Sequence, residues 1–308
     1  MKRAIILLVA LAPIFVYGES YLQPEQIHLS YSGKPSSIWV TWVTFGDTSA
    51  QNAVAHSVVE YGVGKLNLTA SGTQTTFVDG GSEKRKIYIH RVQLKDLKPS
   101  TSYLYHVGSK YGWSAIYYFN TYQLGENWSP RFAVYGDLGN KNAQSLGRLQ
   151  EESQRGHFDM ILHVGDMAYN LDSDNARVGD QFMRQIEPIA AYVPYMTVVG
   201  NHENAYNFSN YVNRFSMPQG EANLFYSFDV GPVHFIALST EFYFYVQYGW
   251  MQIANQYKWL EEDLQKATRN RHKVPWIVTM GHRPMYCVSA DSDDCTKYES
   301  VVGGIKTT

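Results

Sequence analysis

Four short segments of this chain share one pattern, in which an apolar run is followed by glycine and then by an acidic, amide or imidazole side chain. These segments are Gly136-Asp137-Leu138-Gly139, Gly165-Asp166-Met167-Ala168-Tyr169, Gly200-Asn201-His202-Glu203 and Gly281-His282-Arg283-Pro284. Each apolar run reads as a strand, and the chemistry of such sheets gathers at the loops that leave the strand ends. A single Asp after a strand often only caps the next helix. Four ligand-type residues at four equivalent positions predict a metal site instead.

The hydrophobic pattern divides the chain into two domains. Residues 20–125 alternate like an antiparallel sandwich, with strands expected at 38–43 and 88–94. Residues 97–107 look like the corner and following strand of a fibronectin type III module, with Tyr103 as the candidate corner tyrosine. A linker is expected near 125–130, and a second domain over 131–308.

Strands alternate with helices in the second domain. The strand-like runs are 132–135, 160–164, 196–199, 235–238 and 276–280. Apolar residues at helical spacing are Val178, Phe182, Ile186 and Ile189, and then Ile253, Tyr257, Leu260, Leu264 and Ala267. Residues 226–228 and 233–238 are expected to form a hairpin. This order predicts an α/β domain whose sheets are flanked by helices.

Composition excludes some partners. The formal net charge is −2 at pH 7, so nothing indicates a nucleic acid or an anionic membrane as a partner. No segment after the N-terminus is long and apolar enough to span a bilayer.

The N-terminal residues have the features of a secretory signal peptide over 1–18. Lys2 and Arg3 precede an apolar run at 4–16, and small residues follow at possible cleavage positions. A buried N-terminal helix is the alternative. Three glycosylation sequons, at Asn67, Asn127 and Asn207, agree with export. We therefore expect a secreted protein, with the lysosome as an alternative destination.

Only two cysteines are present, Cys287 and Cys295. Their even number, close spacing and exported context favour one small disulfide loop. Two free thiols are the alternative. A cysteine-based zinc site is disfavoured, because two thiols lack companions at ligand spacing.

The glycine-led segments resemble those of the purple acid phosphatases, within the calcineurin-like metallophosphoesterases. The resemblance covers both domains, and the fibronectin-like front domain is typical of the larger members. Residues 283–287 and 293–295 further resemble the long-form animal members of the family. Tyr169 discriminates most, because ordinary phosphatases and diesterases of the superfamily lack a tyrosine there. Taken alone, Tyr169 could equally be a core aromatic.

The resemblance implies a dinuclear centre that contains Fe(III) and a second metal, which is Fe, Zn or Mn. Asp137 and Tyr169 would bind the ferric ion, Asp166 would bridge both metals, and Asn201 and His282 would bind the second metal. Ligation to a cation removes the proton of a tyrosine whose free pKa is about 10. The implied activity is acid hydrolysis of phosphate monoesters.

Other polar residues nearby receive different roles. His202 would donate to the phosphate or to the leaving oxygen, or would be a buried structural histidine. Glu203 would orient His202, with a plain surface carboxylate as the alternative. His163 and Asp172 match no ligand position and are expected to be structural.

The chain departs from the family pattern after His282. The family has a further His-x-His motif that supplies one histidine to each metal, and residues 283–308 contain no histidine. On this ground little or no phosphatase activity is expected of the 308 residues, and a non-catalytic secreted glycoprotein is the alternative function. A secreted phosphodiesterase or nucleotidase is a third alternative, which Tyr169 disfavours.

Overall fold

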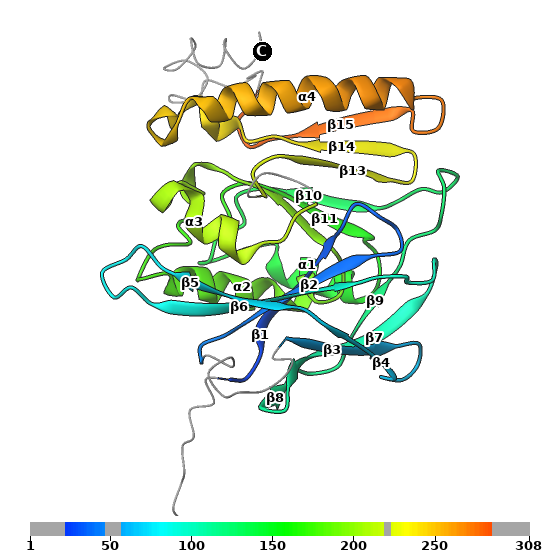
Figure 1. Cartoon of the computed structure of the whole chain (residues 1–308), viewed down its shortest axis with the longest axis vertical. Coiled ribbons are helices and arrows are strands. Elements are labelled where there is room, and N and C mark those ends of the chain that lie inside the picture. Colours follow the sequence, from blue (N-terminus) through cyan, green and yellow to red (C-terminus); the bar gives the residue numbers. More distant parts are fainter. Residues whose placement is uncertain (1–21, 47–56, 219–222, 285–308) are drawn as a thin grey trace, which may run out of the picture.

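The structure is a computed structural model that describes residues 22–46, 57–218 and 223–284 (Figure 1). The predicted signal peptide and the predicted disulfide partners Cys287 and Cys295 lie outside these residues. Within the described residues, no helix combines the length and the apolar character needed to cross a membrane.

The N-terminal domain is built from two antiparallel sheets. Its strands are β1 (Glu25–Tyr31), β2 (Ile38–Thr44), β3 (Val58–Gly62), β4 (Leu68–Ser71), β5 (Thr73–Val78), β6 (Lys86–Leu94), β7 (Ser102–Ser109), β8 (Gly112–Trp113) and β9 (Tyr117–Asn120). One sheet has the order β1-β2-β6-β5, and the other has the order β4-β3-β7-β8 with β9 also paired to β7.

A shared core joins these two sheets. Leu29 and Trp42 of the first sheet lie in one buried cluster with Tyr105 and Phe119 of the second. Burial of an apolar side chain of this size contributes about 1.5–3 kcal/mol, so the cluster holds the two sheets together. The Tyr103 hydroxyl accepts a hydrogen bond of 3.0 Å from the backbone N–H of Lys98, as a tyrosine corner requires. The predicted fibronectin-like sandwich is therefore confirmed.

The C-terminal domain contains two further sheets. Parallel strands β10 (Phe132–Tyr135), β11 (Met160–Val164) and β12 (Tyr195–Val198) form the first. The second contains β13 (Tyr226–Val230), β14 (Val233–Ala237) and β15 (Trp276–Met280), with β13 antiparallel and β15 parallel to β14. The rings of Phe132 and Phe235 meet between the two sheets at 4.9 Å. The domain is a sandwich flanked by helices, as expected.

Strand β12 starts one residue earlier than the sequence pattern predicts, and β14 starts at Val233, as the hairpin prediction has it and two residues before the strand-like run 235–238. Each begins directly after a proline, Pro194 or Pro232. Proline has no backbone N–H to donate to a sheet and commonly precedes the first paired residue. The runs predicted at 132–135, 160–164 and 276–280 have the expected bounds.

The helices are α1 (Leu146–Gln154), α2 (Arg177–Ala190), α3 (Ala205–Arg214) and α4 (Met251–Arg269), with short 3-10 helices η2 (Asn201–Glu203), η4 (Thr240–Tyr243) and η5 (Val246–Tyr248). Helix α2 lies between the parallel sheet and the N-terminal domain (Figure 1). The carboxylate of Glu187 on α2 accepts from the backbone N–H groups of Gln26 and Ile27 at 2.7 and 3.2 Å. This helix therefore fixes the sandwich against the domain that carries the site.

Helix α4 packs differently from the prediction. Tyr257 and Leu264 belong to its predicted buried face but are 45% and 36% exposed. Two polar residues of α4 are buried instead. The side chain of Gln256 forms hydrogen bonds with the backbone of Ser239, and the carboxylate of Asp263 accepts one from the hydroxyl of Ser227 on β13. Because these two side chains form hydrogen bonds, the free-energy cost of burying them is small. A prediction that places only apolar residues on the buried face therefore misses them.

Candidate metal centre

The candidate ligands lie at the ends of strands in both sheets of the C-terminal domain. Asp137 follows β10, Asp166 follows β11 and Asn201 follows β12, so three neighbouring parallel strands place them at one edge. His282 follows β15 of the other sheet. The site is therefore located where the carboxyl ends of the two sheets meet.

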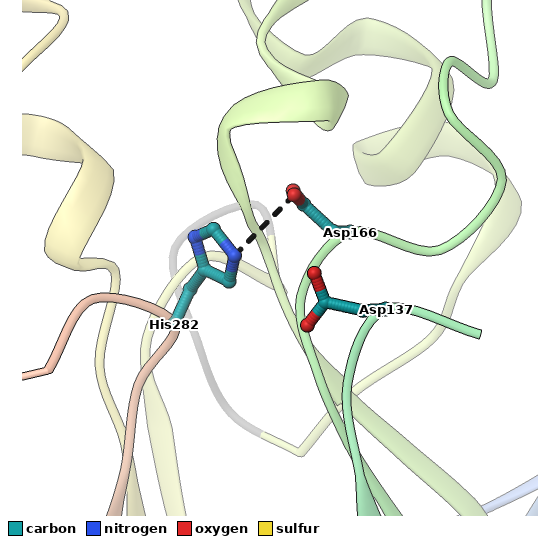
Figure 2. Close-up of side chains that lie close together, drawn as sticks. All are labelled: Asp137, Asp166 and His282. Atoms are coloured by element: carbon teal, nitrogen blue, oxygen red, sulfur yellow. Dashed lines mark ion pairs between the residues drawn. The ribbon is translucent and has the colours of Figure 1, made fainter. Parts of the chain in front are cut away.

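Asp137, Asp166 and His282 form one compact group (Figure 2). Each offers a ligand atom, and these three atoms all lie within 4.8 Å of one another. Nε2 of His282 is 3.5 Å from Oδ2 of Asp166. Asp166 is buried, while Asp137 is exposed, so the group opens to solvent on the Asp137 side.

Tyr169 and Asn201 border this group. The Tyr169 hydroxyl donates a hydrogen bond of 2.6 Å to Oδ1 of Asp137, which places the phenolic oxygen beside the carboxylates. Asn201 begins η2, and the backbone N–H of the next residue, His202, donates to Oδ1 of Asp166 at 3.1 Å. The structure thus brings all five sequence-predicted ligands to one region.

Two glycines of the motifs permit this close approach. Gly165 has φ of +85°, and a Cβ there would lie 2.7 Å from Cδ2 of His282. At Gly200 a Cβ would lie 2.2 Å from Oδ1 of Asp166. Any larger residue would displace a candidate ligand, which explains why glycine precedes the functional residue in both motifs.

His202 faces the acidic group with one nitrogen. Its Nδ1 is 2.6 Å from Oδ1 of Asn170, and its Nε2 is 3.8 Å from Oδ2 of Asp166. Its ring lies 4.4 Å from the ring of Tyr169. Asn170 was not predicted as a site residue, although its place directly after Tyr169 was a usable signal.

Glu203 does not orient His202 as the sequence interpretation expected. Its buried carboxylate accepts three backbone N–H groups, from Asp166 at 3.0 Å, Met167 at 2.9 Å and Gly200 at 2.8 Å. Burial raises the pKa of Glu203 to about 7, against the opposing effect of these hydrogen bonds. Glu203 therefore ties the loop of Asp166 to the segment that carries Asn201 and His202.

Glu241 is a buried residue of the site that the sequence analysis missed. It lies in η4 after β14, and its Oε1 is 3.0 Å from Nδ1 of His282. The signal was available in the sequence, because Ser239-Thr240-Glu241 also follows an apolar strand. That segment has no glycine before its polar residue, so it did not share the pattern.

His163 lies where a structural role is expected, whereas the structural role of half-buried Asp172 stays a prediction. His163 is fully buried on β11, and its Nδ1 is 2.7 Å from the Tyr195 hydroxyl. Burial lowers the pKa of His163 to about 3, which keeps the ring neutral. Burial raises the pKa of Asp172.

Asp166 and His282 each shift the pKa of the other. Burial alone would raise the pKa of Asp166, but the hydrogen bond and charge of His282 outweigh it and lower the value. Burial alone would lower the pKa of His282, but hydrogen bonds to Asp166 and Glu241 raise it to about 10. In the absence of a cation, a proton on His282 therefore balances the two carboxylates.

The donor set fits a pair of transition-metal cations. Carboxylate, phenolate, amide and imidazole groups together suit iron, zinc and manganese. Asp166 lies within 4.8 Å of both Asp137, which Tyr169 contacts, and His282, so its carboxylate could reach cations held on either side.

Comparisons with known proteins agree with this arrangement. Residues 24–121 match the family model described as purple acid phosphatase, N-terminal domain, and residues 130–305 match the calcineurin-like phosphoesterase model. Acid phosphatase type 7 from Mus musculus is 55% identical over 285 residues, which are 92% of this chain and 64% of that protein. The Homo sapiens protein of the same name is 54% identical, with the same two coverages.

A solved structure shares the fold. The purple acid phosphatase PPD1 from yellow lupin seeds matches with a TM-score of 0.69 and 26% identity, over 86% of this chain and 52% of that one. This chain spans 64% of the length of the mouse and human relatives. The two family models, the relatives and the shared fold agree, and this chain belongs to the purple acid phosphatase family of calcineurin-like phosphoesterases.

Proposed function

We propose that this site hydrolyses phosphate monoesters at acid pH with a dinuclear metal centre. The observation that carries the proposal is the convergence of Asp137, Asp166 and His282 within 4.8 Å, with the Tyr169 hydroxyl 2.6 Å from Asp137. The mouse and human relatives are named acid phosphatases, which supports the same activity for this site.

Five residues would hold the metals. Asp137 and Tyr169 would supply anionic oxygens suited to Fe(III), and Asp166 would serve both cations. Asn201 and His282 supply an amide oxygen and an imidazole nitrogen for the second cation, Fe, Zn or Mn. When bound, the two cations supply Lewis acidity that neutralises the charge of the phosphate and acidifies water.

His202 acts on the substrate in this proposal. Its Nδ1 is 2.6 Å from Asn170, so Nε2 is the nitrogen that faces the site. A proton on Nε2 can be donated to a phosphate oxygen or to the leaving oxygen. Asn170 fixes the ring so that this nitrogen points inward.

A secreted, non-catalytic glycoprotein is the second candidate. The exposure of all three sequon asparagines, Asn67, Asn127 and Asn207, supports glycosylation and hence export.

One assay decides between the two candidates. The 308-residue chain is expressed with iron and zinc supplied, and hydrolysis of p-nitrophenyl phosphate is measured at acid pH. Metal-dependent turnover that Asp166→Ala abolishes and Asp174→Ala retains would establish the phosphatase, because Asp174 is exposed and outside the site. No turnover by the unmodified chain would reject the phosphatase function for it.

A further inference from the structure

We propose that Glu241 is a positioning residue for His282, which it orients so that Nε2 is presented to a divalent cation beside Asp166. This inference rests on the proposed dinuclear site. It adds a residue that lies outside the four glycine-led segments and that would control the affinity of one of the two cations.

The two nitrogens of His282 have different partners. Nδ1 is 3.0 Å from Oε1 of Glu241, and Nε2 is 3.5 Å from Oδ2 of Asp166. With Nδ1–H donated to Glu241, the lone pair available for a metal is on Nε2. A carboxylate on the far nitrogen of a ligating histidine fixes its tautomer and ring orientation and increases its basicity.

The fold brings Glu241 and His282 together through two neighbouring strands. β14 and β15 are parallel and pair through Ala237 and Met280, so the segments that follow them leave the sheet side by side. A hydrogen bond of 2.9 Å from the backbone N–H of Arg283 to Oγ1 of Thr240 joins the two segments. The two segments are therefore joined next to the contact between the Glu241 and His282 side chains.

Glu241 is itself held rigidly. It is fully buried, and Nε and Nη2 of Arg283 bond to its two oxygens at 3.0 Å each. The guanidinium carbon of Arg283 lies 4.0 Å from the ring centroid of Phe244. This bidentate pair compensates the buried charge of Glu241 and fixes the direction in which its oxygens point.

A purely structural role must be separated from the positioning role, because Glu241 could serve only to neutralise Arg283. Three variants of the chain make the separation. Arg283→Met leaves the carboxylate on His282. E241Q/R283M retains a neutral acceptor for Nδ1–H, and E241L/R283M removes the acceptor while leaving no unpaired buried cation. Thermal unfolding checks that all three variants are folded.

The readout is the affinity for Zn²⁺, measured by chelator competition on iron-loaded protein, with the visible tyrosinate-to-iron band followed in parallel. We expect R283M, which keeps a carboxylate beside Nδ1 of His282, to bind zinc about 10–100-fold more tightly than E241L/R283M. E241Q/R283M is expected to lie between them. The iron band stays in all three, because Asp137 and Tyr169 are untouched.

Failure of this inference is distinguishable from failure of the proposed function. Equal zinc affinity in R283M and E241L/R283M, with zinc bound by the unmodified chain, would overturn only the role of Glu241. Loss of the iron band together with zinc affinity would also overturn it, because the defect would then be general. No zinc or iron binding by the unmodified chain would overturn both.

Discussion

The Tyr169 hydroxyl donates a hydrogen bond of 2.6 Å to Oδ1 of Asp137, although the two residues follow different strands. Burial and this hydrogen bond raise the pKa of Tyr169, so the phenol keeps its proton while no cation is present. The phenolic oxygen of Tyr169 and Oδ1 of Asp137 are therefore already close together without a cation. Asp137 and Tyr169 would hold the proposed ferric ion, whose charge would favour loss of the phenol proton.

Tyr169→Phe should abolish the visible tyrosinate-to-iron band of the iron-loaded protein. The phenyl ring retains the contact with His202 but has no oxygen to ligate iron. Because Tyr169 is 43% exposed, the free energy of unfolding should change by only about 0.5 kcal/mol. Absorption spectra and urea denaturation of the same sample measure both effects.

Tyr257→Phe is the matched control. Tyr257 is 45% exposed and lies on α4, outside the site, so its variant should keep the band. A band of unchanged position and intensity in Tyr169→Phe would contradict the ferric assignment.

Glu203→Gln should destabilise the protein by about 1–3 kcal/mol. The carboxylate accepts three buried backbone N–H groups, and an amide turns one acceptor oxygen into a donor that faces them. Urea denaturation gives the free energy of unfolding. Glu262→Gln, at an exposed position on α4, should change it little, and equal effects of the two substitutions would refute the role given to Glu203.

The glycine-led motifs could be predicted from sequence because their geometry is local. Asp137 and Asp166 each follow a strand directly, and parallel neighbouring strands end at the same edge of a sheet. Once the strands are identified, the position of these two side chains follows. The same reasoning placed His282, although it belongs to the second sheet.

Contacts across the fold could not be predicted in this way. The positions of Asn170 after Tyr169 and of Glu241 after a strand were visible in the sequence. Their contacts with His202 and His282 form only when separate segments meet, and the sequence pattern does not encode that meeting. Glu203 was assigned to its sequence neighbour His202, whereas backbone N–H groups of the Asp166 loop are nearer. On α4, Asp263 is buried because His234 and Ser227 satisfy its carboxylate.

Asp180→Ala should destabilise the protein by about 3–5 kcal/mol, because it would leave the buried guanidinium of Arg214 without its carboxylate. Arg214 on α3 and Asp180 on α2 are 2.9 Å apart and 1% and 2% exposed. Arg85 of the N-terminal domain also bonds to Asp180, at 2.7 Å. Denaturant unfolding should therefore show a large shift in midpoint.

Glu83→Ala is the matched control for this pair. Glu83 of the N-terminal domain bonds to Arg177 of α2 at 2.6 Å, so it joins the same two parts of the molecule through solvent-exposed side chains. Water screens such a pair, and its loss should leave the unfolding midpoint nearly unchanged. A similar shift in both variants would show that burial is not the cause.

His234 on β14 should make stability depend on pH above neutrality. Its nitrogens are 2.5 Å from Asp229 and 2.8 Å from Asp263. Burial alone would lower the pKa of His234, but these two hydrogen bonds raise it from 6.5 to about 9. A raised histidine pKa stabilises the fold fully below pH 6.5, and this contribution is lost as the pH rises through about 9.

His234→Asn should therefore be less stable than the unmodified protein at about pH 6, with the gap closing toward about pH 10. Urea denaturation across this range measures the gap. His272→Asn, at an exposed position after α4, should follow the unmodified protein throughout. A gap that is equally large at both ends of the range would mean that the packing of His234, rather than its charge, stabilises the sheet against α4.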